Sequence, residues 1–181
     1  YLKCKSERNY LLFVLGISTG YRAGDLVKLR VRDVKEALEN GYFEILEEKK
    51  IHSKNVRKEN LRPRIVKVIY NLSMILRKYI KGMRDYEYLF KSRKGINEHI
   101  TVSHVSRILK EAGEQFGLTN ISAHSLRKTY AYRIYVESDY NILLVKEMLG
   151  HSSVEITKRY LGLDRAEYDK YSDILNKIIR T

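Results

Sequence analysis

The stretch LGHSSVEITKRYLG, residues 149–162, places His151 and Tyr160 nine positions apart, at the two ends of a short segment with helical spacing. Two basic residues precede the tyrosine, and Gly162 follows it after one residue. The chain contains fifteen tyrosines, and this one lies two residues before a glycine inside a basic run. The stretch alone does not explain that placement, so the explanation has to come from the rest of the chain.

Helical spacing of apolar residues continues on both sides of this stretch. The predicted helices are one that ends near Gly20 and further ones over residues 22–30, 71–80, 101–116, 125–136, 141–149, 153–160 and from Asp164 onward, where Glu167 stands in the capping-box position. Within 101–116, the residues at core-facing spacing are Val102, Val105, Ile108, Leu109, Ala112 and Phe116.

The middle of the chain changes from helical to strand-like patterns. GYFEILEE (41–48) alternates like a strand, and RIVKV (64–68) is its expected partner. KKIHSKNVRKENLRPR (49–64) joins them, with seven Lys or Arg and the chain's only proline, and so predicts a solvated hairpin loop. The predicted fold is mainly α with a small antiparallel β-sheet, in one domain over 1–181.

Composition limits the partners and the compartment. The 35 Lys and Arg exceed the 22 Asp and Glu, which gives a net charge of +13 and favours polyanions such as nucleic acid. A single cysteine, Cys4, excludes an internal disulfide framework and a CxxC zinc site. The apolar run YLLFVLGIS is too short to cross a bilayer, so we expect a cytoplasmic protein with no membrane partner.

Familiar nucleotide and metal motifs are absent, but polar residues mark three junctions between loop and helix. The chain has no phosphate-binding glycine loop and no HExxH pattern. Arg22 stands at the start of one helix with Asp25 one turn on, and His124 and Arg127 stand three apart at the start of another. His151 follows Gly150 at a third junction. Arginine binds phosphate through two parallel hydrogen bonds, so these residues could converge on one phosphate.

Each of these residues also has an ordinary structural interpretation when taken singly. Arg22 with Asp25 fits a surface helix pair, His124 fits a locally bonded helix start, and Tyr160 fits a half-buried tyrosine with its hydroxyl at the surface. The basic hairpin fits a solvated face. Only the order of the residues along the chain separates these interpretations from a common site.

That order resembles the catalytic signature of the tyrosine recombinases, the phage-integrase family. The matching stretches are TGYRAGDLVKL, HSLRKTYA and LGHSSVEITKRYLG, and the resemblance covers essentially the whole chain. It implies a catalytic domain of that family, acting as a site-specific recombinase or integrase of a mobile element or chromosome. It also implies double-stranded DNA as substrate, no metal or cofactor, and a homo-oligomer on DNA, a tetramer in the synapse.

The resemblance also implies a role for each residue. Tyr160 would attack a DNA phosphodiester and become joined to the 3′ phosphate. Arg22 and Arg127 would hold the phosphate oxygens, His124 would assist proton transfer at the tyrosine, and His151 would bind a phosphate oxygen. Asp25 would support Arg22, although it is one carbon shorter than the glutamate typical of that position.

A hairpin lysine completes the implied set as general acid for the departing 5′ oxygen. Family members often have a threonine after this lysine, whereas this chain has EKKIHSKN, with Ile51 in that place. Lys50 is the first candidate, and Lys49 and Lys54 are alternatives. The expected further DNA contacts are basic residues of the hairpin and of the helix that carries Arg127, namely Lys49, Lys54, Arg57, Lys58, Arg62 and Lys128.

Alternatives and additional segments remain open. A type IB topoisomerase or resolvase would use the same chemistry, and a non-catalytic DNA-binding module or a basic structural protein would use none. Family members usually carry an N-terminal DNA-binding domain, so we expect this chain to be a fragment of a longer protein. After Asp164, an apolar stripe is predicted either to pack on its own domain or to dock on a neighbouring protomer, and consists of Tyr171, Ile174, Leu175, Ile178 and Ile179.

Overall fold

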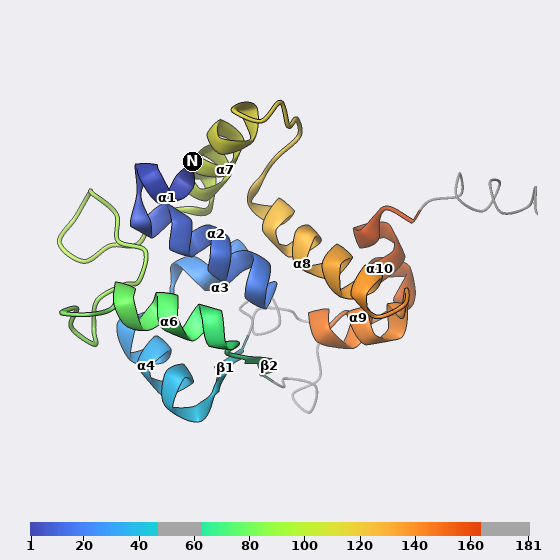
Figure 1. Cartoon of the computed structure of the whole chain (residues 1–181), viewed down its shortest axis with the longest axis horizontal. Coiled ribbons are helices and arrows are strands. Elements are labelled where there is room, and N and C mark those ends of the chain that lie inside the picture. Colours follow the sequence, from blue (N-terminus) through green and yellow to red (C-terminus); the bar gives the residue numbers. More distant parts are fainter. Residues whose placement is uncertain (47–62, 164–181) are drawn as a thin grey trace, which may run out of the picture. The chain divides into compact units, whose positions relative to one another are not determined.

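A computed structural model describes residues 1–46 and 63–163 (Figure 1). Contacts between Cα atoms divide the chain into two compact units, Tyr1–Tyr130 and Ala131–Thr181, and the division falls within helix α8. The elements, in order, are α1 (Leu2–Lys5), α2 (Glu7–Thr19), α3 (Ala23–Val27), α4 (Val31–Asn40), β1 (Tyr42–Ile45), β2 (Arg64–Lys67), α6 (Tyr70–Tyr79), α7 (Val102–Glu114), α8 (Ala123–Glu137), α9 (Ile142–Leu149) and α10 (Val154–Leu161).

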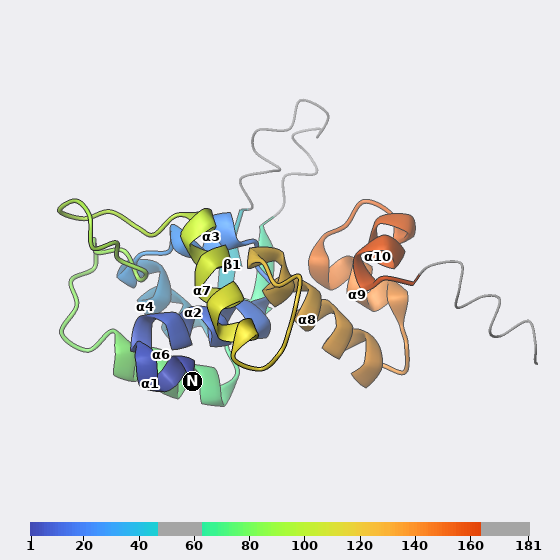
Figure 2. The same cartoon turned by 90° about the horizontal axis from the view of Figure 1, so that it is seen from above.

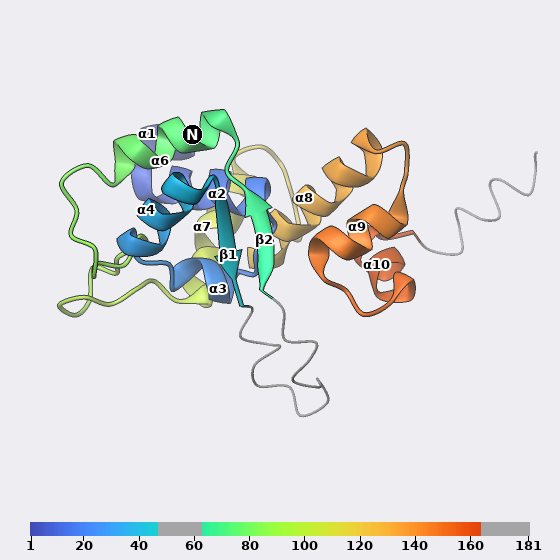
Figure 3. The same cartoon turned by 90° about the horizontal axis from the view of Figure 1, so that it is seen from below.

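The first unit packs helices around one buried cluster beside a two-stranded sheet. Strands β1 and β2 are antiparallel (Figure 3). Phe43 lies opposite Val66, and both side chains are buried. Helix α2 packs against α6 and α3, α3 packs against α7, and α4 packs on β1 (Figure 2). A mainly helical fold with a small antiparallel sheet, predicted from the sequence, is therefore confirmed.

Local sequence explains where the helices begin and end. The side chains of Ser6, Thr101, Asn141 and Ser153 accept hydrogen bonds from backbone N–H groups in the first turns of α2, α7, α9 and α10. Four helices end at a glycine with a left-handed backbone, as sequence signals for helix ends predict, namely α2, α4, α9 and α10. These ends fix where the loops with the candidate site residues start.

Two details of the predicted helices are wrong. The helix expected over 22–30 ends at Val27, and a separate helix, α4, follows from Val31, where the Arg30 N–H donates to the Asp33 carboxylate (2.7 Å). In α7, Val105 and Leu109 are buried as expected, but Val102 is exposed (43%). The helix predicted to reach residue 116 ends at Glu114, so Phe116 lies beyond it and is exposed (68%).

Several predictions fall outside the described residues. They concern the tip of the hairpin between β1 and β2 and the helix expected from Asp164, with its apolar stripe. The single domain over 1–181 stays a prediction. None of the described helices is long and apolar enough to cross a membrane.

Candidate active site

The turn between α2 and α3 presents Arg22. Helix α2 ends at Gly20, whose φ of 61° turns the chain sharply, and the Gly20 N–H donates to the Gly16 carbonyl. Arg22 has extended backbone angles and is the N-cap of α3, where its carbonyl accepts the N–H groups of Asp25 (3.0 Å) and Leu26 (2.9 Å). Its side chain is half-buried, and Asp25 is 8% exposed.

Gly20 cannot be replaced at this turn without displacing a neighbour. A Cβ atom built there would lie 2.7 Å from Cγ and 2.9 Å from Cε1 of the Tyr130 ring, closer than real Cβ contacts allow. The positive φ disfavours any side chain as well. The glycine therefore lets Tyr130, in the second turn of α8, pack directly on the backbone that leads to Arg22.

Helix α8 brings Arg127 to the same turn. Arg127 is 2% exposed, and its Nη1 donates to the Gly20 carbonyl (2.6 Å) across 107 residues of sequence. Gly20 precedes Arg22 by two residues. The hydrogen bond therefore joins Arg127 of α8 to the turn that carries Arg22, the other arginine predicted for the site. His124, one turn before Arg127, is exposed at the start of α8.

A third arginine, Arg64 of β2, also donates to the Gly20 carbonyl, through Nη1 (3.0 Å). Its Nη2 donates to the Thr19 carbonyl, and the residue is 6% exposed. Arg64 is not among the site residues predicted from the sequence. The available signal was its place two residues from Val66, which makes it a charged residue on the inward face of an amphipathic strand.

In the second unit, the end of α9 positions His151. The Gly150 N–H donates to the Glu147 carbonyl and the His151 N–H to the Lys146 carbonyl, which is the Schellman arrangement at a helix end. His151 therefore follows a fixed turn and lies immediately before α10, which carries Tyr160.

His151 contacts both Thr157 and Tyr160. Its Nδ1 lies 3.0 Å from Thr157 Oγ1, and the fully buried Thr157 hydroxyl donates to the Ser153 carbonyl (3.3 Å). A hydroxyl has one hydrogen, so a Thr157 hydroxyl that donates to Ser153 accepts from Nδ1–H of His151. The rings of His151 and Tyr160 meet edge to face, with centroids 5.3 Å apart and planes at 70°.

The remaining predicted site residues divide into two sets. Lys128 is exposed on α8, in the helix that carries Arg127. The hairpin residues lie outside the described part of the chain, and these are Lys49, Lys50, Lys54, Arg57, Lys58 and Arg62.

Thr157, like Arg64, was not predicted from the sequence, because no local pattern separates a threonine that binds a histidine from an ordinary helix residue.

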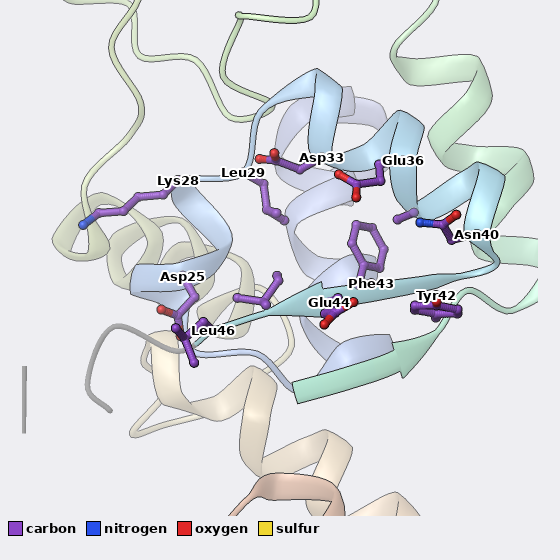
Figure 4. Close-up of a pocket in the computed structure, with 12 residues that line it drawn as sticks. Asp25, Lys28, Leu29, Asp33, Glu36, Asn40, Tyr42, Phe43, Glu44 and Leu46 are labelled. Carbon is purple, nitrogen blue, oxygen red and sulfur yellow. The ribbon is translucent and has the colours of Figure 1, made fainter. Parts of the chain in front are cut away.

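A cavity of about 310 Å³ lies between α4 and β1, with Asp25 at one end (Figure 4). Its other charged lining is one lysine, Lys28, and three carboxylates, Asp33, Glu36 and Glu44, so acidic groups outnumber the single cation. Such a lining repels a phosphodiester. Among the described residues there is no group of three or more His, Cys, Asp or Glu side chains that could hold a metal ion.

A basic cluster near the start of α7 contains His104, Arg107 and Arg8. Arg107 Nη2 lies 2.6 Å from His104 Nδ1 and Arg8 Nη2 lies 3.5 Å from His104 Nε2. Desolvation first, and then the charges of Arg107 and Arg8, lower the pKa of His104. Arginine only donates, so Arg107 requires an unprotonated Nδ1, which agrees with a neutral His104.

These features define the class of protein as a mainly helical domain with a small sheet and a polar, arginine-rich turn. The chain belongs to the Phage integrase family, which its residues 1–167 match. It is 33% identical over 178 residues to the Bacillus subtilis protein described as "Probable integrase/recombinase YoeC", with 96% of this chain and 90% of that protein covered. The chain is therefore homologous to tyrosine recombinases, which are DNA strand-transferring enzymes.

Solved structures agree with this assignment of the fold. The crystal structure of XerA recombinase matches with a TM-score of 0.66 and 23% identity, over 98% of this chain and 59% of that one. XerH site-specific recombinase, bound to a palindromic difH substrate in a post-cleavage complex, matches with a TM-score of 0.59 and 25% identity, over 94% and 46%. The chain thus spans about half the length of these two recombinases.

Proposed function

We propose that this chain is a site-specific DNA recombinase that breaks and rejoins DNA strands through a 3′-phosphotyrosine intermediate. Family membership supports this proposal, and one geometric observation carries it. The guanidinium of Arg127 is buried and hydrogen-bonded to Gly20, two residues before Arg22. This contact links Arg127 to the turn that carries Arg22, which supports the proposal that the two arginines bind one phosphate.

In the proposed first step, the Tyr160 hydroxyl oxygen attacks a DNA phosphorus atom. The new bond joins the tyrosine oxygen to the 3′ phosphate, the bond from phosphorus to the 5′ oxygen breaks, and the 5′ oxygen leaves with a proton. Attack by the 5′ hydroxyl of another strand reverses the step and releases Tyr160. Tyrosine has an ordinary pKa near ~10, so its hydroxyl needs a base or cationic neighbours to react at neutral pH.

Arg22 and Arg127 are proposed to bind the two non-bridging phosphate oxygens. Negative charge grows on these oxygens as the phosphorus becomes five-coordinate, and fixed donors already aimed at them stabilise that charge without reorganisation. The Arg127 guanidinium is buried and donates to the Gly20 carbonyl, which supports a fixed orientation for it. Asp25, buried one turn after Arg22, is proposed to support the helix start that carries Arg22.

The histidines are proposed to act on protons and phosphate oxygens. Thr157 holds Nδ1 of His151, so Nε2 is the ring nitrogen that would bind a phosphate oxygen. The edge-to-face contact sets the spacing of the His151 and Tyr160 rings. His124 is proposed to receive the tyrosine proton, and its exposure at the start of α8 suits exchange with solvent or substrate.

Lys50 is proposed as the general acid that protonates the departing 5′ oxygen, with Lys49 and Lys54 as alternatives. Lys128 and the basic hairpin residues are proposed to bind the DNA backbone, which agrees with the net charge of +13. Recombination exchanges strands between two duplexes, so we further propose that the protein acts as a homo-oligomer on DNA, a tetramer in the synapse.

Covalent trapping on a suicide DNA substrate tests this function. Wild-type protein should form an adduct that survives denaturation, because the 5′ product is lost and rejoining fails. Tyr160→Phe should form none while binding DNA within a few-fold of wild type, since one hydroxyl adds little to a phosphate-dominated interface. Tyr132→Phe, at an exposed tyrosine of α8, is the matched control and should react normally.

The result also separates the remaining alternatives. Adduct from Tyr160→Phe would mean that another tyrosine is the nucleophile. DNA binding without adduct from wild-type protein would favour a non-catalytic binding module. A topoisomerase or resolvase would form the same adduct, and relaxation of supercoiled DNA without recombination between paired sites would favour those functions.

A further inference from the structure

Arg64 occupies a position where a charged side chain is unexpected. It is the first residue of β2 and is 6% exposed, with its side chain on the same inward face as Val66. Burying a guanidinium is costly unless hydrogen-bond acceptors replace water. The hydrogen-bond acceptors around the Arg64 guanidinium therefore indicate its structural role.

The Arg64 guanidinium donates to backbone carbonyls at the end of α2. Nη1 donates to Gly20 (3.0 Å) and Nη2 donates to Thr19. The last carbonyls of a helix have no partner within the helix and carry its partial negative charge, so a cation here completes the helix end. Two adjacent carbonyls suit the planar fork of arginine, whereas a lysine ammonium is a single point charge.

Two tyrosines hold Arg64 in this position. Its Cζ lies 4.7 Å from the ring centroid of Tyr21 and 5.6 Å from that of Tyr130, within the range of cation–π attraction. The Tyr21 hydroxyl also donates to the Arg64 carbonyl (2.9 Å), which fixes the strand beside the turn. Backbone and side chain of Arg64 are thus both fastened to the segment that leads into α3.

The Gly20 carbonyl is shared with Arg127. A carbonyl oxygen has two lone pairs, and here one oxygen accepts from Arg64 (3.0 Å) and from Arg127 (2.6 Å). The position of this oxygen therefore bears on where the Arg127 guanidinium lies, and Arg64 contacts the same oxygen from strand β2. Arg22 follows two residues later on the same backbone.

We infer that Arg64 is a positioning residue for strand transfer, which holds the Gly20 carbonyl in the place that orients Arg127 and presents Arg22. This inference rests on the proposed function. Arg64 acts through other groups and contacts no reacting atom. Its loss should therefore lower the rate of the chemical step and leave affinity for DNA nearly unchanged.

Arg64→Lys tests the inference, because it keeps the charge but cannot bind two carbonyls in the same way. Arg30→Lys is the matched control in the same unit. Arg30 also donates to a backbone carbonyl, that of Tyr86 (2.5 Å), and stacks on the Tyr88 ring at 4.2 Å, so it makes the same two kinds of contact with other residues. Circular dichroism in buffer without denaturant first establishes that the two variants are equally folded. Their rates are then compared under the same conditions.

Single-turnover adduct formation at saturating suicide substrate is the first measurement. Arg64→Lys should react about 10- to 100-fold more slowly than wild type, the effect of a misplacement of about 1 Å, with the Kd for uncleaved DNA within about threefold. Arg30→Lys should stay within about twofold of wild type. Equal rates for Arg64→Lys and wild type, or equal slowing in both variants, would overturn the inference and leave Arg64 as a general structural residue.

A double variant tests the link to Arg127. If Arg64 acts through Arg127, then Arg64→Lys/Arg127→Lys should react no more than about threefold more slowly than Arg127→Lys alone, because the second change removes an interaction already lost. If the two single substitutions instead slow the reaction by factors that multiply in the double variant, Arg64 does not act through Arg127.

A third measurement needs no cleavage and so separates failure of the inference from failure of the proposed function. The side-chain N–H signals of Arg127, assigned by their loss in Arg127→Lys, should be sharp in wild type and Arg30→Lys and broadened in Arg64→Lys. If wild-type protein forms no adduct, the proposed function fails, and unchanged Arg127 signals in Arg64→Lys would independently overturn the positioning role.

Discussion

Replacing Gly20 with alanine should destabilise the protein more than the same change at Gly41, although both glycines end a helix with a left-handed backbone. Their φ values are 61° and 82°. A Cβ at Gly20 would meet the Tyr130 ring, with Cγ at 2.7 Å and Cε1 at 2.9 Å, whereas a Cβ at Gly41 has no atom within 4 Å. The pair therefore isolates the cost of the close approach from the cost of the backbone conformation.

The magnitudes follow from these two terms. A left-handed backbone costs a non-glycine residue about 1–2 kcal/mol, which applies to both variants. Forcing a methyl group into a filled space costs about 1–3 kcal/mol more, which applies to Gly20→Ala alone. The expected loss is thus about 2–5 kcal/mol for Gly20→Ala and about 1–2 kcal/mol for Gly41→Ala, from a total that is commonly about 5–15 kcal/mol.

Urea unfolding followed by circular dichroism measures the difference. With a slope of about 2 kcal/mol per molar urea, the Gly20→Ala midpoint should lie about 0.5–1.5 M below that of Gly41→Ala. In a double-mutant cycle, Tyr130→Ala should relieve part of the Gly20→Ala defect, giving a coupling of about 1 kcal/mol. Equal midpoints, or no coupling to Tyr130, would refute the packing of Tyr130 on this turn.

Three further predictions concern catalysis and pH. Lys50→Ala should slow cleavage of ordinary DNA by about 100-fold but barely affect a substrate with a sulfur leaving group, and equal defects on both would redirect attention to Lys49 or Lys54. Arg127→Lys should slow cleavage at least about 100-fold, while wild-type cleavage persists in excess chelator; loss of activity restored by magnesium would contradict the arginine clamp. His104 has a pKa below its usual ~6.5, so the unfolded chain protonates first, and the free energy of unfolding should fall as pH drops from about 6.5 through the lowered value. An NMR midpoint for His104 at or above ~6.5 would contradict this.

Helix ends and strand pairing could be predicted from the sequence because their signals are local. The left-handed glycine at Gly20, the capping side chains Asn141 and Ser153, and the alternation of Arg64 to Val68 each lie within a few residues of the structure that they specify. Helix α4 was missed although Val31, Val34 and Ala37 are buried along one face, because the preceding helix was extended across Arg30.

Burial along a helix face was predicted less well. Spacing identifies the apolar stripe of α7 but not where neighbouring elements stop covering it, so Val105 is buried while Val102 is exposed, and Phe116 lies beyond the helix end at Glu114. Coverage depends on elements distant in sequence, and spacing within one helix contains no information about them.

The sequence by itself determined which residues are candidates for the site, because the order of Arg22, His124, Arg127, His151 and Tyr160 is a property of the chain. Only the tertiary structure revealed that the Gly20 carbonyl accepts from Arg127 and Arg64, 107 and 44 residues away. Thr157 was likewise identified only by the orientation of His151 after its helix end. A motif specifies side chains at positions along the chain, whereas a hydrogen bond between distant residues exists only once packing has fixed both partners, and backbone carbonyls, which every residue has, leave no mark in the sequence.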